Sequence, residues 1–195
     1  MSTPEIPSVP PDIQAQLDRM LEAHANRQRY SHFDKGVLAS ITDDALEQAL
    51  LDYLFDRLEQ FQQDQDQAFA ALSPQFRVFF CTWEVEAEVM NGGLNQYFWN
   101  SSGQNAERVP PALEELGDSV AADLMRQAIR TAIAELPEMS KFLKAGTLEA
   151  FSESYKHTSL NELDDPFCRR AEGFPALRLA YVRSQPEAFA TPCDA

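Results

Sequence analysis

Cysteine is scarce in this 195-residue chain, and long apolar runs are absent. The three cysteines are far apart and form no C-x-x-C pair: Cys81, Cys168 and Cys193. This pattern excludes a disulfide framework and a structural zinc knot, and it indicates a reducing compartment. No apolar run approaches the length of a membrane span, and the first residues lack the basic and apolar regions of a secretion signal. We therefore expect a cytoplasmic protein that does not bind membranes.

Motifs of metal binding and catalysis are also lacking. The three histidines are scattered, and none follows a glutamate at the Glu-x-x-His spacing of di-iron sites: His24, His32 and His157. The chain has no G-x-S-x-G elbow and no glycine-rich phosphate loop. Glu84 and Glu88 share a helix face and could do acid–base work, but carboxylates beside an apolar stripe are more often only solvated. The sequence predicts no metal, no cofactor and no enzymatic activity.

Positive charge is the next shortage, because 31 acidic residues face 16 basic ones and leave a formal charge of −15. Such a field repels nucleic acid and attracts basic surfaces. It therefore argues against direct nucleic-acid binding and favours a partner with a basic surface. Residues 1–75 carry thirteen acids and five bases, a net of −8, and are the most acidic part. The alternative is that the charge only maintains solubility.

The apolar residues repeat at helical spacing through most of the chain, and no segment alternates as a strand does. Thr42 is a candidate N-cap before one apolar stripe, and Ser73-Pro74 marks the start of another helix. Further helices are expected near residues 12–29, 110–117, 118–137, 160–165 and 174–184, and a weaker one is expected to begin at Thr147. We predict an all-α protein with a flexible arm at residues 1–11, which hold four prolines, and a single multi-helix domain at residues 12–195.

A line of carboxylates is predicted on the second helix, at residue steps of four, three and seven: Asp52, Asp56, Glu59 and Asp66. At 3.6 residues per turn these side chains fall in one stripe opposite the leucines, over roughly 21 Å. We expect them to face solvent and to bind the lysines and arginines with which a partner holds phosphates. The alternative is the ordinary solvated face of an amphipathic helix.

The most unusual segment is residues 91–103, which hold three of the seven glycines, four side-chain amides and three aromatics. In a structural interpretation, Gly92 and Gly93 form a tight turn that ends a helix, the aromatics fill the core, and the amides satisfy backbone groups at the turn. In a functional interpretation, the segment lines a small-molecule pocket or an enzyme site. The residues concerned are Asn91, Gly92, Gly93, Gln96, Tyr97, Phe98 and Asn100.

This segment resembles the signature NGGxxQYFxN followed by SSG, which is found in the bacterial DNA-mimic protein family, a small all-helical group. The helix end at residues 112–117 also fits, and looser matches follow at residues 160–165, at Phe167 and Tyr181, and at residues 186–189. The resemblance implies an acidic protein that mimics the charge of DNA and inhibits a basic DNA-binding protein, with a homodimer as a possible state. Two alternatives remain: an immunity-type or antitoxin-like inhibitor of a basic nuclease, and a small-molecule-binding domain or enzyme built on the signature.

Overall fold

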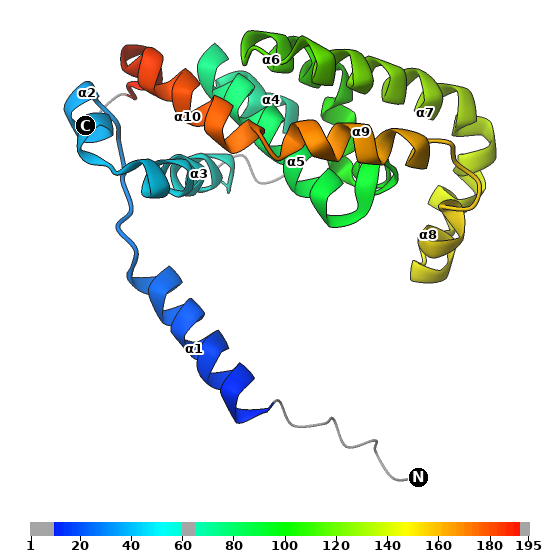
Figure 1. Cartoon of the computed structure of the whole chain (residues 1–195), viewed down its shortest axis with the longest axis horizontal. Helices are drawn as coiled ribbons and strands as arrows, with labels where there is room; N and C mark the ends of the chain where they lie inside the picture. The colour runs from blue at the N-terminus through cyan, green and yellow to red at the C-terminus, as the bar shows by residue number, and fades with distance from the viewer. Residues whose placement is uncertain (1–9, 60–64, 192–195) are drawn as a thin grey trace.

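The computed structural model describes residues 10–59 and 65–191, and within these ranges every regular element is a helix (Figure 1). The α-helices are α1 (Pro11–Asn26), α2 (Lys35–Ser40), α3 (Asp43–Glu59), α4 (Gln65–Ala71), α5 (Pro74–Trp99), α6 (Val109–Glu115), α7 (Ser119–Ala145), α8 (Leu148–Ser154), α9 (Asn161–Ala171) and α10 (Phe174–Ser184). Two 3₁₀ helices complete the list, η1 (Ser101–Arg108) and η2 (Pro186–Phe189). The predicted all-α fold is confirmed. The arm predicted at residues 1–11 lies outside the described residues, except for Pro10 and Pro11.

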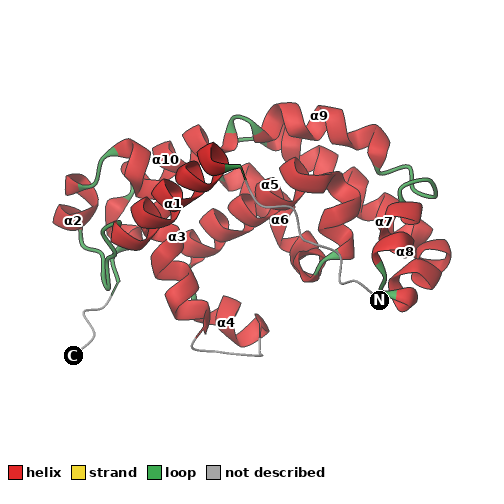
Figure 2. Cartoon of the chain, turned by 90° about the horizontal axis from the view of Figure 1, so that it is seen from below, coloured by secondary structure: helices red, strands yellow, loops and turns green. Residues whose placement is uncertain are grey.

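Helix α5 lies at the centre and contributes to two buried apolar clusters. Its C-terminal part packs with α6, α7 and α9, where Leu94 and Tyr97 are fully buried. Its N-terminal part packs with α2, α3, α10 and η2, where Phe76 contacts the ring of Phe189 at a centroid distance of 5.1 Å. Both views place α2 and α3 toward one end of the long axis and α7 and α8 toward the other (Figures 1 and 2). One helix therefore joins the two halves of the body.

Several helices begin where the sequence places an N-cap. The Ser73 hydroxyl accepts a hydrogen bond from the Phe76 N–H at 3.3 Å, and Pro74 occupies the first position of α5. The Asp118 carboxylate accepts from the Ala121 N–H at 3.0 Å, and Thr147 caps α8 in the same way. These side chains bond amide groups that the helix itself leaves without partners, so the cap residues fix the starts of the helices.

Helix α7 is longer than predicted. The sequence indicated an end at Pro137, but the helix continues through this proline to Ala145. A proline inside a helix loses one backbone hydrogen bond. Pro137 lies on an exposed turn of α7, and the buried side chain of Met139 packs the following turn against the body. The helix ends at Gly146, whose φ of 62° is the left-handed conformation that closes helices.

Helix α1 extends away from the body, as Figure 1 shows, and none of its residues is buried. It is joined to the body at its C-terminal end, where the chain passes close to α3. Of the predicted acidic stripe, Asp52, Asp56 and Glu59 lie on α3, which is described to Glu59, and Asp66 lies on α4. Residues 60–64 lie outside the described ranges, so the expectation of one continuous helix that carries all four carboxylates stays a prediction.

Candidate functional site

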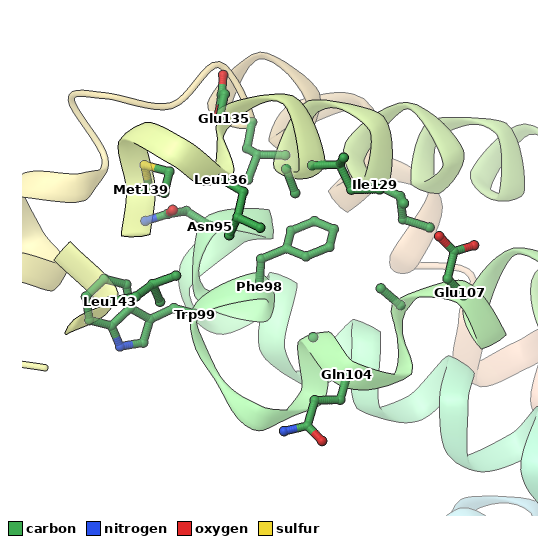
Figure 3. A pocket seen from close by; sticks show the side chains of 15 residues that line it. Asn95, Phe98, Trp99, Gln104, Glu107, Ile129, Glu135, Leu136, Met139 and Leu143 are labelled. Carbon is green, nitrogen blue, oxygen red and sulfur yellow. The ribbon is translucent and has the colours of Figure 1, made fainter. Parts of the chain in front are cut away.

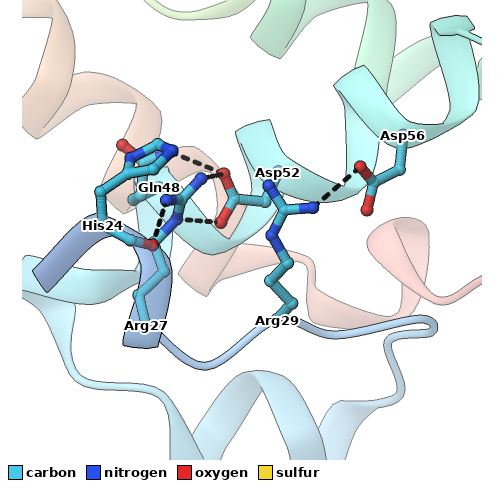
Figure 4. Close-up of polar contacts among 6 residues, drawn as sticks. All are labelled: His24, Arg27, Arg29, Gln48, Asp52 and Asp56. Atoms are coloured by element: carbon cyan, nitrogen blue, oxygen red, sulfur yellow. Dashed lines mark hydrogen bonds and ion pairs between the residues drawn. The ribbon is translucent and has the colours of Figure 1, made fainter. Parts of the chain in front are cut away.

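The stripe carboxylates differ in exposure and in their partners. Asp52 is buried, with only 4% of its side chain exposed, and Arg27 contacts both its oxygens at 2.5 Å (Figure 4). The Gln48 side chain donates a third bond to Asp52 at 2.8 Å. The prediction that Asp52 faces solvent is wrong, because the segment after α1 crosses α3 at this point and covers the carboxylate. Burial raises the pKa of Asp52, but the bonds from Arg27 and Gln48 outweigh it, so the pKa is lowered on balance.

The other three carboxylates are exposed. Asp56 lies 3.3 Å from Nη1 of Arg29 (Figure 4), and Asp66 lies 2.7 Å from Nη2 of Arg108. Glu59, at the end of α3, has no ion-pair partner among the described residues. We call Asp56, Glu59 and Asp66 the acidic patch. Exposed ion pairs contribute little to the stability of a fold, so their carboxylates can form ion pairs with another protein at low cost.

Most basic side chains of the described chain are already used in internal ion pairs. Arg170 pairs with the buried Asp118, and Arg183 pairs with Asp43. Many exposed carboxylates consequently have no cation within the described residues. They are Asp12, Asp18, Glu22, Asp34, Asp44, Glu59, Glu107, Glu115, Glu149, Glu162, Asp165 and Glu172. Much of the negative charge of the chain is therefore carried by exposed carboxylates that have no ion pair among the described residues.

The signature glycines interrupt α5. Gly92 and Gly93 have non-helical backbone angles, and Gly93 has a φ of 73°, so the chain turns before the helix resumes at Leu94. The Asp164 carboxylate accepts the Leu94 N–H at 2.8 Å, and the Tyr155 hydroxyl donates to the Gly92 carbonyl at 2.6 Å. The glycines break the helix as predicted, but the predicted end of the helix at this point is wrong, because α5 continues to Trp99. Side chains from α9 and the end of α8, and not the signature amides, satisfy its backbone groups.

The signature amides instead bind carboxylates of the preceding helix. The Gln96 and Asn100 side chains both donate to Oε2 of Glu88 at 2.8 Å. Asn105, from η1, donates to Oε2 of Glu84 at the same distance. The expectation that Gln96 and Asn100 serve the backbone is wrong, because the kink directs them back along α5 toward its acidic face. Asn91 is exposed.

Glu84 is the most perturbed carboxylate of this cluster. Burial raises its pKa to about 7, against the opposing bond from Asn105, and the neighbouring Glu88 raises it further. Tyr97 is fully buried, and its hydroxyl has no hydrogen-bond partner among the described residues. Burial likewise raises the pKa of the Cys81 thiol to about 12, so this cysteine is not a nucleophile at neutral pH. Glu84 was recognisable from its i, i+4 spacing to Glu88, but its partner Asn105 was not.

An apolar groove lies between the end of α5, η1 and α7 (Figure 3). Its volume is about 270 Å³, and its walls are mostly apolar side chains of α5 and α7. Of the seven predicted signature residues, only Phe98 lines it, next to Asn95 and Trp99 from the same run. The polar members of the signature that were proposed to bind a ligand, Gln96 and Asn100, are at Glu88 instead.

One buried charge was not predicted. Arg178 of α10 is 1% exposed, and its Nη2 lies 2.8 Å from Glu47 and 2.6 Å from Glu86. These three residues lie on α3, α5 and α10 and join those helices at the second apolar cluster. No local sequence pattern identifies such a cluster, because its members are more than 30 residues apart.

Within the described residues, no group of three or more histidine, cysteine or acidic side chains is placed to hold a metal ion. None of the helices in the described ranges combines the length and the apolar character needed to cross a membrane.

Comparison with known proteins gives a family but no individual relative. No curated protein and no solved structure matches the chain. The family model that matches is described as DMP19-like protein, and it covers residues 70–185, which is more than half of the chain. The resemblance to the bacterial DNA-mimic protein family that the signature suggested is wrong, because this match is to a distinct family. The matched range runs from the end of α4 through α5, with its glycine kink, to the end of α10, and the chain therefore belongs to the DMP19-like protein family.

Proposed function

We propose that this protein is an acidic interaction protein that binds a basic DNA-binding protein on the surface with which that partner contacts DNA. The observation that carries the proposal is the large set of exposed carboxylates without a cation in the described chain. A partner that normally neutralises phosphates supplies the missing cations, so complex formation would compensate both charged surfaces. On this account the protein competes with DNA, and direct binding to nucleic acid is disfavoured by charge.

The acidic patch is the part of the surface that we assign to this contact. Asp56, Glu59 and Asp66 are exposed, and they lie in the most acidic part of the sequence. Arg29 meets Asp56 at an exposed position, and the carboxylate of Asp66 is itself 86% exposed, although its partner Arg108 is also held by Asn105 and the ring of Phe69. A partner can therefore reach both carboxylates, and it can replace Arg29 at low cost. Asp52 is not part of this surface, because Arg27 and Gln48 already use both of its oxygens.

The test uses two triple variants that change the net charge equally. One replaces Asp56, Glu59 and Asp66 with lysine, and the other replaces Glu149, Glu162 and Glu172, which are also exposed but lie on or after α8 and α9. Both are used to capture proteins from a lysate of the source cells at low and high salt. The patch variant should lose the basic partner that the wild type captures, whereas the control variant should retain most of the binding.

Equal loss in both variants would show that only net charge matters and would remove the acidic patch as the contact surface. Mass spectrometry of the captured protein identifies the class of partner. A basic nuclease would support the inhibitor alternative, and an acidic or neutral protein held at high salt would contradict the proposal.

A further inference from the structure

We propose that an arginine side chain of the basic partner packs on two aromatic rings at the surface, those of Phe55 of α3 and Trp83 of α5. We call this pair the aromatic anchor. The inference rests on the proposed function, since it names the side chain by which the basic partner is held. It goes beyond that function because the anchor carries no charge of its own and selects a partner that presents arginine, rather than lysine, at this point.

The aromatic anchor is a pair of accessible rings on two neighbouring helices. The ring centroids of Phe55 and Trp83 are 5.3 Å apart, and the rings meet edge to face at 77°. Phe55 is 41% exposed, and Trp83 is partly exposed. Met90, which is 50% exposed, follows Trp83 by seven residues and so lies on the same face of α5. Accessible tryptophan, phenylalanine and methionine side chains on one surface are characteristic of protein–protein contacts.

Carboxylates of the acidic patch lie directly beside this anchor. Glu59 follows Phe55 by four residues on α3, so the two side chains are neighbours on one face of the helix. Glu59 has no ion pair among the described residues, and Asp56, which directly follows Phe55, has only the exposed contact with Arg29 at 3.3 Å. A cation that lies over the rings therefore has carboxylates within reach on the same side of α3.

The two helices place little positive charge near the anchor. Helix α5 has no lysine or arginine after Arg77, which lies before Trp83. The single basic residue of α3 is Arg57, and it lies roughly 200° around the helix from Phe55, over the ring of Tyr53. The cation that would complement the acidic side chains beside the rings must therefore come from another molecule.

The chemistry of this surface fits a guanidinium group. A guanidinium is planar and weakly hydrated, so it can lie on an aromatic face and still donate hydrogen bonds to a carboxylate, which an ammonium does less well. The chain itself contains this arrangement, because Arg108 lies 4.2 Å from the ring centre of Phe69 and also pairs with Asp66 at 2.7 Å. Among the described residues, no lysine or arginine lies over Phe55 or Trp83 in this way. The anchor is thus open to an arginine of the partner.

Salt separates the anchor from the acidic patch. Attraction between exposed charges is screened by salt, whereas contact between a guanidinium and aromatic rings also removes water from apolar surface and is screened less. The acidic patch therefore supplies the part of the affinity that salt removes, and the anchor supplies a part that remains at high salt.

The test uses two labelled peptides of equal length and charge, whose basic residues are all arginine in one and all lysine in the other. Fluorescence anisotropy at low and high salt measures their binding to the chain and its variants. At high salt the wild type should bind the arginine peptide about tenfold more tightly than the lysine peptide. Phe55→Leu and Trp83→Leu keep an apolar side chain and the net charge, and each should remove most of this preference. Trp83→Phe, which keeps a ring, should retain much of it.

Phe151→Leu is the matched control, because the rings of Phe151 and Trp99 form a similar pair, at 5.1 Å, on α8 and the end of α5. It should leave the preference for arginine unchanged. Circular dichroism of each variant verifies its helices, and Phe55→Leu, at the more exposed ring, decides the question if Trp83→Leu does not fold. In a Trp99→Phe background Trp83 is the remaining one of two tryptophans, and the arginine peptide should shift its emission.

The anchor would be overturned by a wild type that does not distinguish the two peptides, by a preference that survives both leucine variants, or by an equal loss in Phe151→Leu. The acidic patch is tested separately by the variant with lysine at Asp56, Glu59 and Asp66, which should lose both peptides at low salt. If that variant binds both peptides as the wild type does, the acidic patch is wrong as the contact surface. If the wild type binds neither peptide even at low salt, both the anchor and the proposed function are contradicted.

Discussion

The Asp164 carboxylate fills the space that a side chain at Gly93 would occupy. One Asp164 oxygen lies 2.6 Å from the position of a Cβ at residue 93, and the other accepts the Leu94 N–H at 2.8 Å. Gly93 also has a φ of 73°, which residues with a side chain rarely adopt. These two properties explain why residue 93 is a glycine. The turn requires a positive φ, and Asp164 of α9 occupies the space in which a side chain would lie.

Replacement of Gly93 by alanine should therefore cost about 3 kcal/mol of folding free energy, as strain and steric overlap add. Gly117→Ala is a matched control, because Gly117 also has a positive φ, of 96°, but no atom lies within 4 Å of its Cβ position. It should cost only about 1 kcal/mol. Urea unfolding of both variants measures the difference. Equal losses would show that contact with Asp164 is unimportant.

The burial of Asp52 predicts a difference between two neighbouring turns of α3. Asp52→Asn should destabilise the fold by about 2 kcal/mol, because it leaves Arg27 without its charged partner. Asp56→Asn should cost less than about 0.5 kcal/mol, since the Asp56–Arg29 pair is exposed. The pKa of Asp52 is lowered in the folded state, so its contribution is present above the ordinary value of 3.8 and is lost as pH falls through the lower folded pKa. Thermal melts of both variants at neutral and strongly acidic pH test this.

Glu84 predicts the opposite dependence on pH. Its folded pKa of about 7 lies above the ordinary value of 4.5, so ionisation of the buried carboxyl opposes folding as pH rises through this window. Glu84→Gln should match the wild type near pH 4 and be more stable by about 2 kcal/mol near pH 8. Glu162→Gln, a change at an exposed carboxylate, serves as the control. A constant difference between Glu84→Gln and the wild type across this range would contradict the assigned burial.

The buried Arg178 gives a fourth prediction. Arg178→Met should cost about 3 kcal/mol, because it leaves Glu86 half-buried without its cation. Adding Glu86→Gln to this variant should recover part of the loss, since the uncompensated charge is then removed. Denaturant unfolding of the two single variants and the double variant gives the coupling. Additive effects would show that the two side chains do not stabilise each other.

Sequence patterns predicted the positions of the helices well, but they predicted the contacts of individual side chains poorly. Ser73, Asp118 and Thr147 act locally, within a turn of their own positions, so the starts of their helices could be predicted. The helical spacing of the apolar residues in α3 correctly predicted that its leucines are buried. It could not show that Arg27, 25 residues away in the sequence, covers Asp52 on the opposite face of the helix. The partners of Gln96 and Asn100 were missed for a related reason, because the kink at Gly93 changes the direction of everything after it. Pro137 was interpreted as an end because a local rule cannot include the packing that continues α7.

Competition with DNA tests the proposed function most directly. The partner captured by the wild type is purified, bound to a labelled DNA duplex, and titrated with the acidic protein while fluorescence anisotropy reports the bound DNA. The account predicts that the protein displaces the duplex completely, that the variant with lysine at Asp56, Glu59 and Asp66 does so much less effectively, and that added salt weakens the complex steeply. A ternary complex in which the partner holds DNA and the acidic protein together would contradict it.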